Sequence, residues 1–202
     1  MTKIKLCGLT RACDIEYVNE LLPEYIGFVF APGSRRYIAP EKAETLRKNL
    51  SKKIIPVGVF VDEKTEAVAA LVKSGIIDMV QLHGNEDEEY IAALRQKVNC
   101  PVIKAFCVKS KADVSGANNS SADYILLDSG GGSGKSFDHS LLKYISRPFF
   151  LAGGLTPENV ENSVRTLHPF GVDASSSLET NGVKDKNKMT AFINAVRKAE
   201  KP

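Results

Sequence analysis

Residues 54–61 of the chain read Ile-Ile-Pro-Val-Gly-Val-Phe-Val, and the stretch is apolar along its whole length. Its length and its β-branched residues are typical of a strand. A strand without polar alternation is expected where helices cover both faces of a sheet, which is the situation of a parallel sheet. The stretch therefore indicates the α/β class.

Other short apolar stretches alternate with amphipathic stretches along the chain. The further strand candidates are Lys3–Cys7, Tyr25–Phe30, Met79–Leu82, Val102–Phe106, Tyr124–Asp128, Phe149–Ala152 and Gly171–Ala174. The helix candidates are Ala12–Leu22, Pro40–Leu50, Thr65–Ser74, Asp87–Val98, Ser140–Ile145, Pro157–Leu167 and Asn187–Lys198. Thr156 before Pro157 is a typical helix start, with proline at the first helical position. The Ser, Gly and Asn residues of Ser110–Asn119 predict a short or irregular helix.

Eight strand candidates, each followed by a helix or loop, predict a parallel, closed eight-stranded sheet: the α/β class and the (β/α)8 or TIM barrel fold. The 202 residues allow roughly 25 for each unit, the compact limit of this fold. No linker divides the chain, so we expect a single domain over residues 1–202. An open, doubly wound sheet is the alternative, and the even spacing of the units favours closure.

The composition excludes several functional classes. Apolar residues make up 43% and charged residues 25% of the chain, as in ordinary globular proteins. The net charge of +3 is too small to indicate nucleic acid or a membrane surface. No apolar run approaches the roughly 18 residues of a membrane span, and the N-terminus has no signal-peptide core. We therefore expect a cytoplasmic protein that binds neither nucleic acid nor membrane.

The four cysteines form no CxxC pair and fit no zinc-site spacing. No metal is therefore expected, and in a reducing compartment all four should be free thiols. Cys13, Cys100 and Cys107 are interpreted as small buried apolar residues. Cys7 differs because it ends the first predicted strand.

Active sites of (β/α)8 barrels lie at the C-terminal ends of the strands, which makes Cys7 and Asp128 the catalytic candidates. Alternation places Cys7 opposite Ile4 and Leu6, which should face the helices, so the thiol should face the barrel mouth. The same rule places Asp128 opposite Leu127. A base and an acid on two sides of one mouth suit proton transfer at two points of a substrate. A core role for Cys7 and a capping role for Asp128 are the alternatives.

Turns rich in glycine or serine follow the seventh and eighth strand candidates. Gly153 and Gly154 follow one strand, and Ser175 and Ser176 follow the other. Glycines let backbone amides approach a ligand, and helix N-termini add unpaired N–H groups. Such turns after strands seven and eight form the usual phosphate site of this fold. We expect a phosphate there, and two ordinary tight turns are the alternative.

Two further loops carry residues of a kind that binds ligands. Arg35 and Arg36 follow the second strand and could bind a carboxylate, or could form a solvated surface pair. Residues 129–136 read Ser-Gly-Gly-Gly-Ser-Gly-Lys-Ser, which lacks the first glycine of the nucleotide-binding P-loop pattern. Because only a short helix follows, a flexible lid beside Asp128 is the better interpretation.

Several motifs follow one another in a specific order: Lys5–Thr10, Gly27–Phe30, Ser34–Tyr37, Val57–Val61, Val80–Gly84, Leu127–Asp128, Gly131–Asp138, Ala152–Leu155 and Val172–Ser176. Together they resemble the phosphoribosylanthranilate isomerase family, and the resemblance extends over essentially the whole chain. Each motif is weak alone. Their order along one chain makes the resemblance specific.

The resemblance implies an Amadori rearrangement of N-(5-phosphoribosyl)anthranilate to 1-(2-carboxyphenylamino)-1-deoxyribulose 5-phosphate in tryptophan biosynthesis, without cofactor or metal. It also implies that Cys7 is the general base, that Asp128 is the general acid and that Arg36 contacts the anthranilate carboxylate. The phosphate would be bound by Gly153, Gly154, Ser175 and Ser176. Asp173, His83 and Gln81 match family positions and are expected to bind substrate or to support the site. The family includes monomers and dimers, so either a monomer or a homodimer is expected.

The residues agree with this chemistry. Asp128 would protonate the furanose ring oxygen and open the ring, and Cys7 would remove the C2 proton to give an enamine that becomes the ketone. Ordinary pKa values of about 3.9 and 8.5 favour the opposite protonation states at neutral pH. A partly buried mouth would raise the first pKa, and helix N-termini would lower the second. The chain departs from the family in having Ser177 where a glycine is usual, and in a short loop after Asp128.

Two other classes of function are the alternatives. One is another sugar-phosphate (β/α)8 isomerase or epimerase, against which Cys7 argues, because the related histidine-pathway isomerase has an aspartate at that position. The other is a non-catalytic phosphate-binding module, which would bind a sugar phosphate without turnover.

Overall fold

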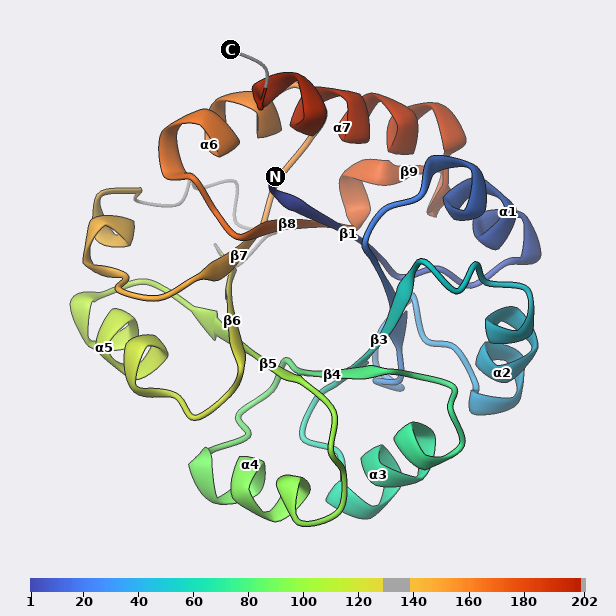
Figure 1. Cartoon of the computed structure of the whole chain (residues 1–202), viewed down its shortest axis with the longest axis horizontal. Coiled ribbons are helices and arrows are strands. Elements are labelled where there is room, and N and C mark those ends of the chain that lie inside the picture. Colours follow the sequence, from blue (N-terminus) through green and yellow to red (C-terminus); the bar gives the residue numbers. More distant parts are fainter. Residues whose placement is uncertain (129–138, 201–202) are drawn as a thin grey trace.

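The structure is a computed structural model, and it describes residues 1–128 and 139–200. Eight parallel strands close into a barrel in chain order, and the helices surround it (Figure 1). The barrel strands are β1 (Lys3–Cys7), β2 (Tyr25–Val29), β3 (Ile55–Phe60), β4 (Met79–Leu82), β5 (Val102–Cys107), β6 (Tyr124–Asp128), β7 (Phe149–Ala152) and β8 (Gly171–Ala174). The predicted closed parallel barrel is confirmed, and the open doubly wound sheet is wrong.

Helices follow most strands. The α-helices are α1 (Ala12–Leu21), α2 (Pro40–Lys48), α3 (Thr65–Lys73), α4 (Glu88–Arg95), α5 (Lys111–Asn119), α6 (Val160–Leu167) and α7 (Lys186–Ala199). The short elements are the 3₁₀ helices η1 (His139–Tyr144) and η2 (Ser176–Leu178) and the hairpin strands β9 (Glu179–Thr180) and β10 (Val183–Lys184). No helix within the described residues is long and apolar enough to cross a membrane.

Two helices differ from the expectation. The fifth is a regular α-helix because the Ser110 hydroxyl accepts the N–H of Asp113 while the Asp113 carboxylate accepts the N–H of Ser110, a capping box that outweighs the weak helix propensity of its sequence. The sixth begins at Val160 rather than Pro157. There the Asn159 side chain accepts the N–H of Thr156 at 2.8 Å, which holds residues 156–159 in a turn before the helix starts.

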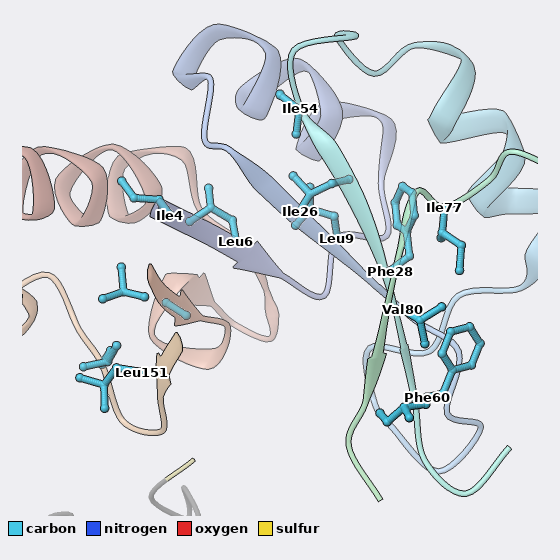
Figure 2. Close-up of a cluster of buried hydrophobic side chains, with 14 of the residues drawn as sticks. Ile4, Leu6, Leu9, Ile26, Phe28, Ile54, Phe60, Ile77, Val80 and Leu151 are labelled. Carbon is cyan, nitrogen blue, oxygen red and sulfur yellow. The ribbon is translucent and has the colours of Figure 1, made fainter. Parts of the chain in front are cut away.

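The sheet separates two apolar layers. Ile4, Leu6 and Leu127 belong to the outer layer between the strands and the helices, and Figure 2 shows Ile4 and Leu6 in it. Leu126 belongs to the inner layer, within the barrel. The alternation expected for β1 and β6 is therefore confirmed, and it directs Cys7 and Asp128 to the inside of the barrel.

An aromatic cluster fills the N-terminal half of the barrel. The Phe150 ring lies 5.6 Å from that of Tyr25, 5.9 Å from that of Tyr124 and 5.3 Å from that of Phe170, measured between centroids. Gly171 leaves the space for this ring, because a Cβ there would lie 2.6 Å from it. The cluster closes one end of the barrel and leaves the polar residues at the other.

Replacing Phe150 with alanine should lower the free energy of unfolding by about 3–5 kcal/mol, because the buried ring leaves a cavity among the other aromatic side chains. Urea unfolding followed by circular dichroism measures this loss. The exposed Val183→Ala change is the control and should alter stability by less than about 0.5 kcal/mol. Equal effects of the two changes would show that the aromatic cluster does not stabilise the barrel.

Candidate active site

A cavity of about 560 Å³ opens at the C-terminal ends of the barrel strands. Its lining includes every residue that the sequence predicted for the site: Cys7, Arg36, Gln81, His83, Asp128, Gly153, Gly154, Asp173, Ser175 and Ser176. A second cavity, of about 520 Å³, lies around Met1 and Phe170 at the opposite end of the barrel. The site is placed at the first cavity because the chemically active side chains converge there, as the fold requires.

Cys7 occupies a narrow position at the end of β1. It is paired in register with Gly27 of β2, where a Cβ would lie 2.5 Å from the Cys7 Sγ atom. The thiol also packs with the apolar side chains of Val29 and Val59 and is almost fully buried. Gly27 therefore leaves room for the sulfur, and the apolar walls keep water from it.

Burial raises the pKa of the Cys7 thiol above its ordinary value. The positive charge of the Lys5 ammonium group acts in the opposite direction, and the negative charge of Asp173 raises the pKa further. Cys7 is therefore a protonated thiol at neutral pH. The lowering expected from helix N-termini does not prevail, because removing the sulfur from water is the larger effect.

Lys5 is a member of the site that the sequence reasoning missed. Its ammonium is fully buried and lies 3.1 Å from the Asp173 carboxylate. Burial alone would lower the Lys5 pKa, but Asp173 and Cys7 together raise it, so Lys5 is a cation. The sequence did contain a signal for Lys5: it lies two residues before Cys7 and therefore on the same inward face of the strand. A lysine is rarely buried there without a charged partner.

Asp128 lies at the end of β6 and belongs to a chain of polar side chains. Its Oδ2 atom is 3.4 Å from Nε2 of His83, and Nδ1 of His83 is 2.8 Å from Nε2 of Gln81. In this arrangement the amide of Gln81 donates to Nδ1, so the ring proton lies on Nε2 and faces Asp128. Gln81 and His83 thus orient the carboxyl group, and the buried Oε1 atom of Gln81 has no partner among the described residues.

Arg36 is held by a carboxylate that the sequence reasoning also missed. Its Nε atom donates to Glu179 Oε1 at 2.5 Å, and one terminal nitrogen donates to Oε2 at 3.0 Å. Gly8, with φ of 83°, allows the side chain to lie across it, because a Cβ there would lie 2.4 Å from Arg36 Cδ. The arginine therefore lines the cavity in one fixed orientation instead of forming the solvated surface pair.

The phosphate hypothesis concerns the two turns after β7 and β8, and the glycine turn after β7 has an unusual backbone. Gly153 and Gly154 have φ values of 82° and 68°, in the left-handed region that favours glycine. The hydroxyl of Ser175 donates to the Cys7 carbonyl oxygen at 2.9 Å, so it ties the turn to β1. The hydroxyl of Ser177, where the family pattern has glycine, is buried without a partner among the described residues.

The three other cysteines are less buried than the sequence predicted. The prediction that Cys107 is buried is wrong: it ends β5 and is exposed, while Cys13 and Cys100 are only partly buried. No group of three or more His, Cys, Asp or Glu side chains within residues 1–128 and 139–200 is placed to hold a metal ion. The P-loop-like segment that was predicted to form a lid, residues 129–136, lies outside the described residues.

Known proteins resemble this chain along its full length. The sequence model of the N-(5'phosphoribosyl)anthranilate (PRA) isomerase family matches residues 4–195. An N-(5'-phosphoribosyl)anthranilate isomerase from Endomicrobium trichonymphae is 46% identical, over 98% of this chain and 99% of that protein.

Solved structures agree with the sequence comparison. The phosphoribosylanthranilate isomerase of Thermotoga maritima is 38% identical with a TM-score of 0.90, covering 98% of this chain and 100% of that one. A second isomerase structure contains reduced 1-(o-carboxyphenylamino)-1-deoxyribulose 5-phosphate; it is 35% identical with a TM-score of 0.87 over 98% of this chain and 100% of that one. The Thermotoga maritima enzyme is dimeric.

The burial of Cys7 predicts a slow reaction with alkylating reagents. Only the thiolate reacts, and its fraction rises as the pH passes the pKa. We expect the rate of Cys7 alkylation by iodoacetamide to rise with pH and to reach its midpoint at a higher pH than the thiol of a short reference peptide. Mass spectrometry of peptides separates Cys7 from the exposed Cys107, which should react first. A midpoint at or below that of the reference peptide would show that burial does not raise the pKa of the Cys7 thiol.

Proposed function

This chain belongs to the N-(5'-phosphoribosyl)anthranilate isomerase family and is an isomerase of tryptophan biosynthesis, and we propose that Cys7 and Asp128 are its general base and general acid. The reaction is the Amadori rearrangement of N-(5-phosphoribosyl)anthranilate to 1-(2-carboxyphenylamino)-1-deoxyribulose 5-phosphate. The observation that supports the two roles is the single cavity in which a thiol, a carboxyl group, an arginine and two glycine or serine turns meet.

The two anionic ends of the substrate define how it would lie. Its phosphate fits the turns at Gly153–Gly154 and Ser175–Ser176, whose backbone N–H groups can donate to phosphate oxygens. Its anthranilate carboxylate fits Arg36 on the β2 side of the mouth, as a guanidinium suits a planar carboxylate. The ribose then spans the centre of the cavity, which Cys7 and Asp128 both line.

Proton transfers at two atoms complete the rearrangement. Asp128 gives a proton to the furanose ring oxygen, the bond from that oxygen to C1 breaks, and the anilino nitrogen forms a Schiff base with C1. Cys7 removes the proton from C2, and the electron pair becomes the C1–C2 double bond of an enamine. The C2 hydroxyl then loses its proton and C1 gains one, so that substrate and product are isomers.

Lys5 has a role in the proposed mechanism because the Cys7 thiol is protonated at rest. Because Cys7 is protonated at neutral pH, the reactive thiolate is a minor species. The buried ammonium of Lys5 lowers the free energy of that species, since opposite charges attract strongly away from water. His83 lies beside Asp128 and holds its carboxyl group in place for the proton transfer to the ring oxygen.

We expect a small-molecule sugar-phosphate substrate, no nucleic acid partner, a monomer or homodimer, and a cytoplasmic location where the pathway operates. Light scattering after size-exclusion chromatography measures the oligomeric state.

A turnover assay distinguishes the isomerase from a non-catalytic phosphate-binding module. The substrate is generated from anthranilate and phosphoribosyl pyrophosphate with a transferase. The loss of anthranilate-type fluorescence is then followed after this protein is added.

The variants Cys7→Ala and Asp128→Asn should each lower kcat by about two to four orders of magnitude, because each removes one proton-transferring group. Circular dichroism should show an intact barrel in both variants. The matched control is Cys107→Ala, which removes a thiol at the mouth that has no assigned role and should retain activity. Full activity of either catalytic variant would remove that residue from the mechanism.

Replacing Arg36 with alanine should raise KM by about 10- to 100-fold and affect kcat much less. A charge-assisted contact made equally in ground and transition states contributes to binding rather than to the chemical step. Steady-state kinetics in the same fluorescence assay separates the two constants. An unchanged KM would exclude Arg36 from substrate binding.

A further inference from the structure

The β9–β10 hairpin follows directly after the serine turn of the candidate phosphate site. Its two loop residues, Asn181 and Gly182, have φ values of 52° and 80°, which is typical of a type I′ turn. Glu179 and Lys184 are opposite each other in the antiparallel pair, so their side chains share one face. Both are buried, whereas Thr180, on the other face, is exposed.

The buried face of this hairpin makes a continuous set of polar contacts across the mouth. Glu179 accepts from Arg36 at 2.5 and 3.0 Å and from Lys184 at 2.7 Å. Lys184 in turn donates to the backbone carbonyl of Ser175 at 2.9 Å. The Ser175 hydroxyl donates a hydrogen bond to the carbonyl oxygen of Cys7. The contacts therefore connect Arg36, the serine turn after β8 and strand β1.

The charges in this network suit an anionic ligand. Arg35, Arg36 and Lys184 share the carboxylate of Glu179, which leaves positive charge in excess. Burial would raise the pKa of Glu179, but its bonds to Arg36 and Lys184 outweigh burial and lower it, so the group is a carboxylate. A buried ion pair contributes little net stability compared with apolar packing, so its main effect here is on geometry.

We propose that Glu179 and Lys184 are positioning residues that make one preorganised unit of the two anion-binding parts of the site. Glu179 holds the Nε edge of Arg36, so the opposite edge of the guanidinium is presented to the substrate carboxylate. Lys184 fixes Glu179 to the turn that binds the phosphate. The inference rests on the proposed role of Arg36, and neither positioning residue touches the reacting atoms.

A double-mutant cycle tests whether Glu179 acts through Arg36. Wild type, Arg36→Ala, Glu179→Gln and the double variant are compared by steady-state kinetics. Glu179→Gln should raise KM about 10-fold or more with little change in kcat, because an arginine that must be ordered on binding binds more weakly. The double variant should have the KM of Arg36→Ala alone, since the effect of Glu179 disappears with the group that it holds.

Additive effects on KM would overturn the proposal, as would a Glu179→Gln variant with unchanged KM or with a loss confined to kcat. A raised KM for Arg36→Ala beside an unchanged KM for Glu179→Gln would overturn only the positioning role. An unchanged KM for Arg36→Ala would overturn both the positioning role and the proposed role of Arg36. If Glu179→Gln does not fold, Glu179→Asp, which keeps the charge but is too short to hold the same contacts, enters the same cycle.

Two further measurements separate positioning from stability. Glu161→Gln is the matched control, because Glu161 bridges Arg165 and Lys198 on the outer helices and its loss should leave KM unchanged. Competitive inhibition is then measured with the two probes, anthranilate and inorganic phosphate. Glu179→Gln should weaken inhibition by anthranilate more than by phosphate, and Lys184→Met should do the reverse. Equal weakening of both probes by both variants would indicate a general structural defect and overturn the assignment.

Discussion

The pairing of β1 with both β2 and β8 closes the barrel, and the polar site depends on this closure. Because β1 and β8 are in register, Lys5 and Asp173 are direct partners on neighbouring strands. Their side chains meet inside the barrel, where an isolated ammonium or carboxylate would be strongly disfavoured. The other edge of β1 pairs Cys7 with Gly27, which gives the thiol its space. One strand therefore positions both the buried cation and the proposed base.

The inside of the barrel is divided along its axis. Phe150 and its aromatic neighbours fill the N-terminal half, while ionisable groups occupy the C-terminal half. This division lets apolar packing stabilise the fold in one region and leaves the other available for chemistry. At the C-terminal ends of the strands, the apolar side chains of Val29 and Val59 pack against the Cys7 sulfur, and burial raises the pKa of the thiol. The burial that shapes the pocket thus opposes the ionisation that the proposed mechanism needs, and the charge of Lys5 partly offsets it.

The mouth of the barrel is completed by segments that are far apart in the chain. Arg36 follows β2, whereas Glu179 and Lys184 belong to the hairpin after η2, yet their side chains form one network. The fold brings these loops together because all the βα connections emerge at the same end of the barrel. Residues that touch no reacting atom can therefore affect how the substrate binds, through the side chains that they hold.

The sequence by itself determined the eight barrel strands and their order, the closed parallel barrel and the direction of Cys7 and Asp128, because apolar periodicity and side-chain alternation are local properties. It also identified ten of the residues that line the cavity, through strand-end position and family resemblance. The start of α6 depended on the hydrogen bond that the Asn159 side chain accepts, and the regularity of α5 on the capping box between Ser110 and Asp113; helix propensities reveal neither. The Lys5–Asp173 pair, the Glu179–Arg36–Lys184 network and the pKa of Cys7 were decided only by tertiary structure. Each of them depends on contacts between strands or loops that are distant in the sequence. The strength of these contacts is set by burial and by distances that exist only after the barrel has closed.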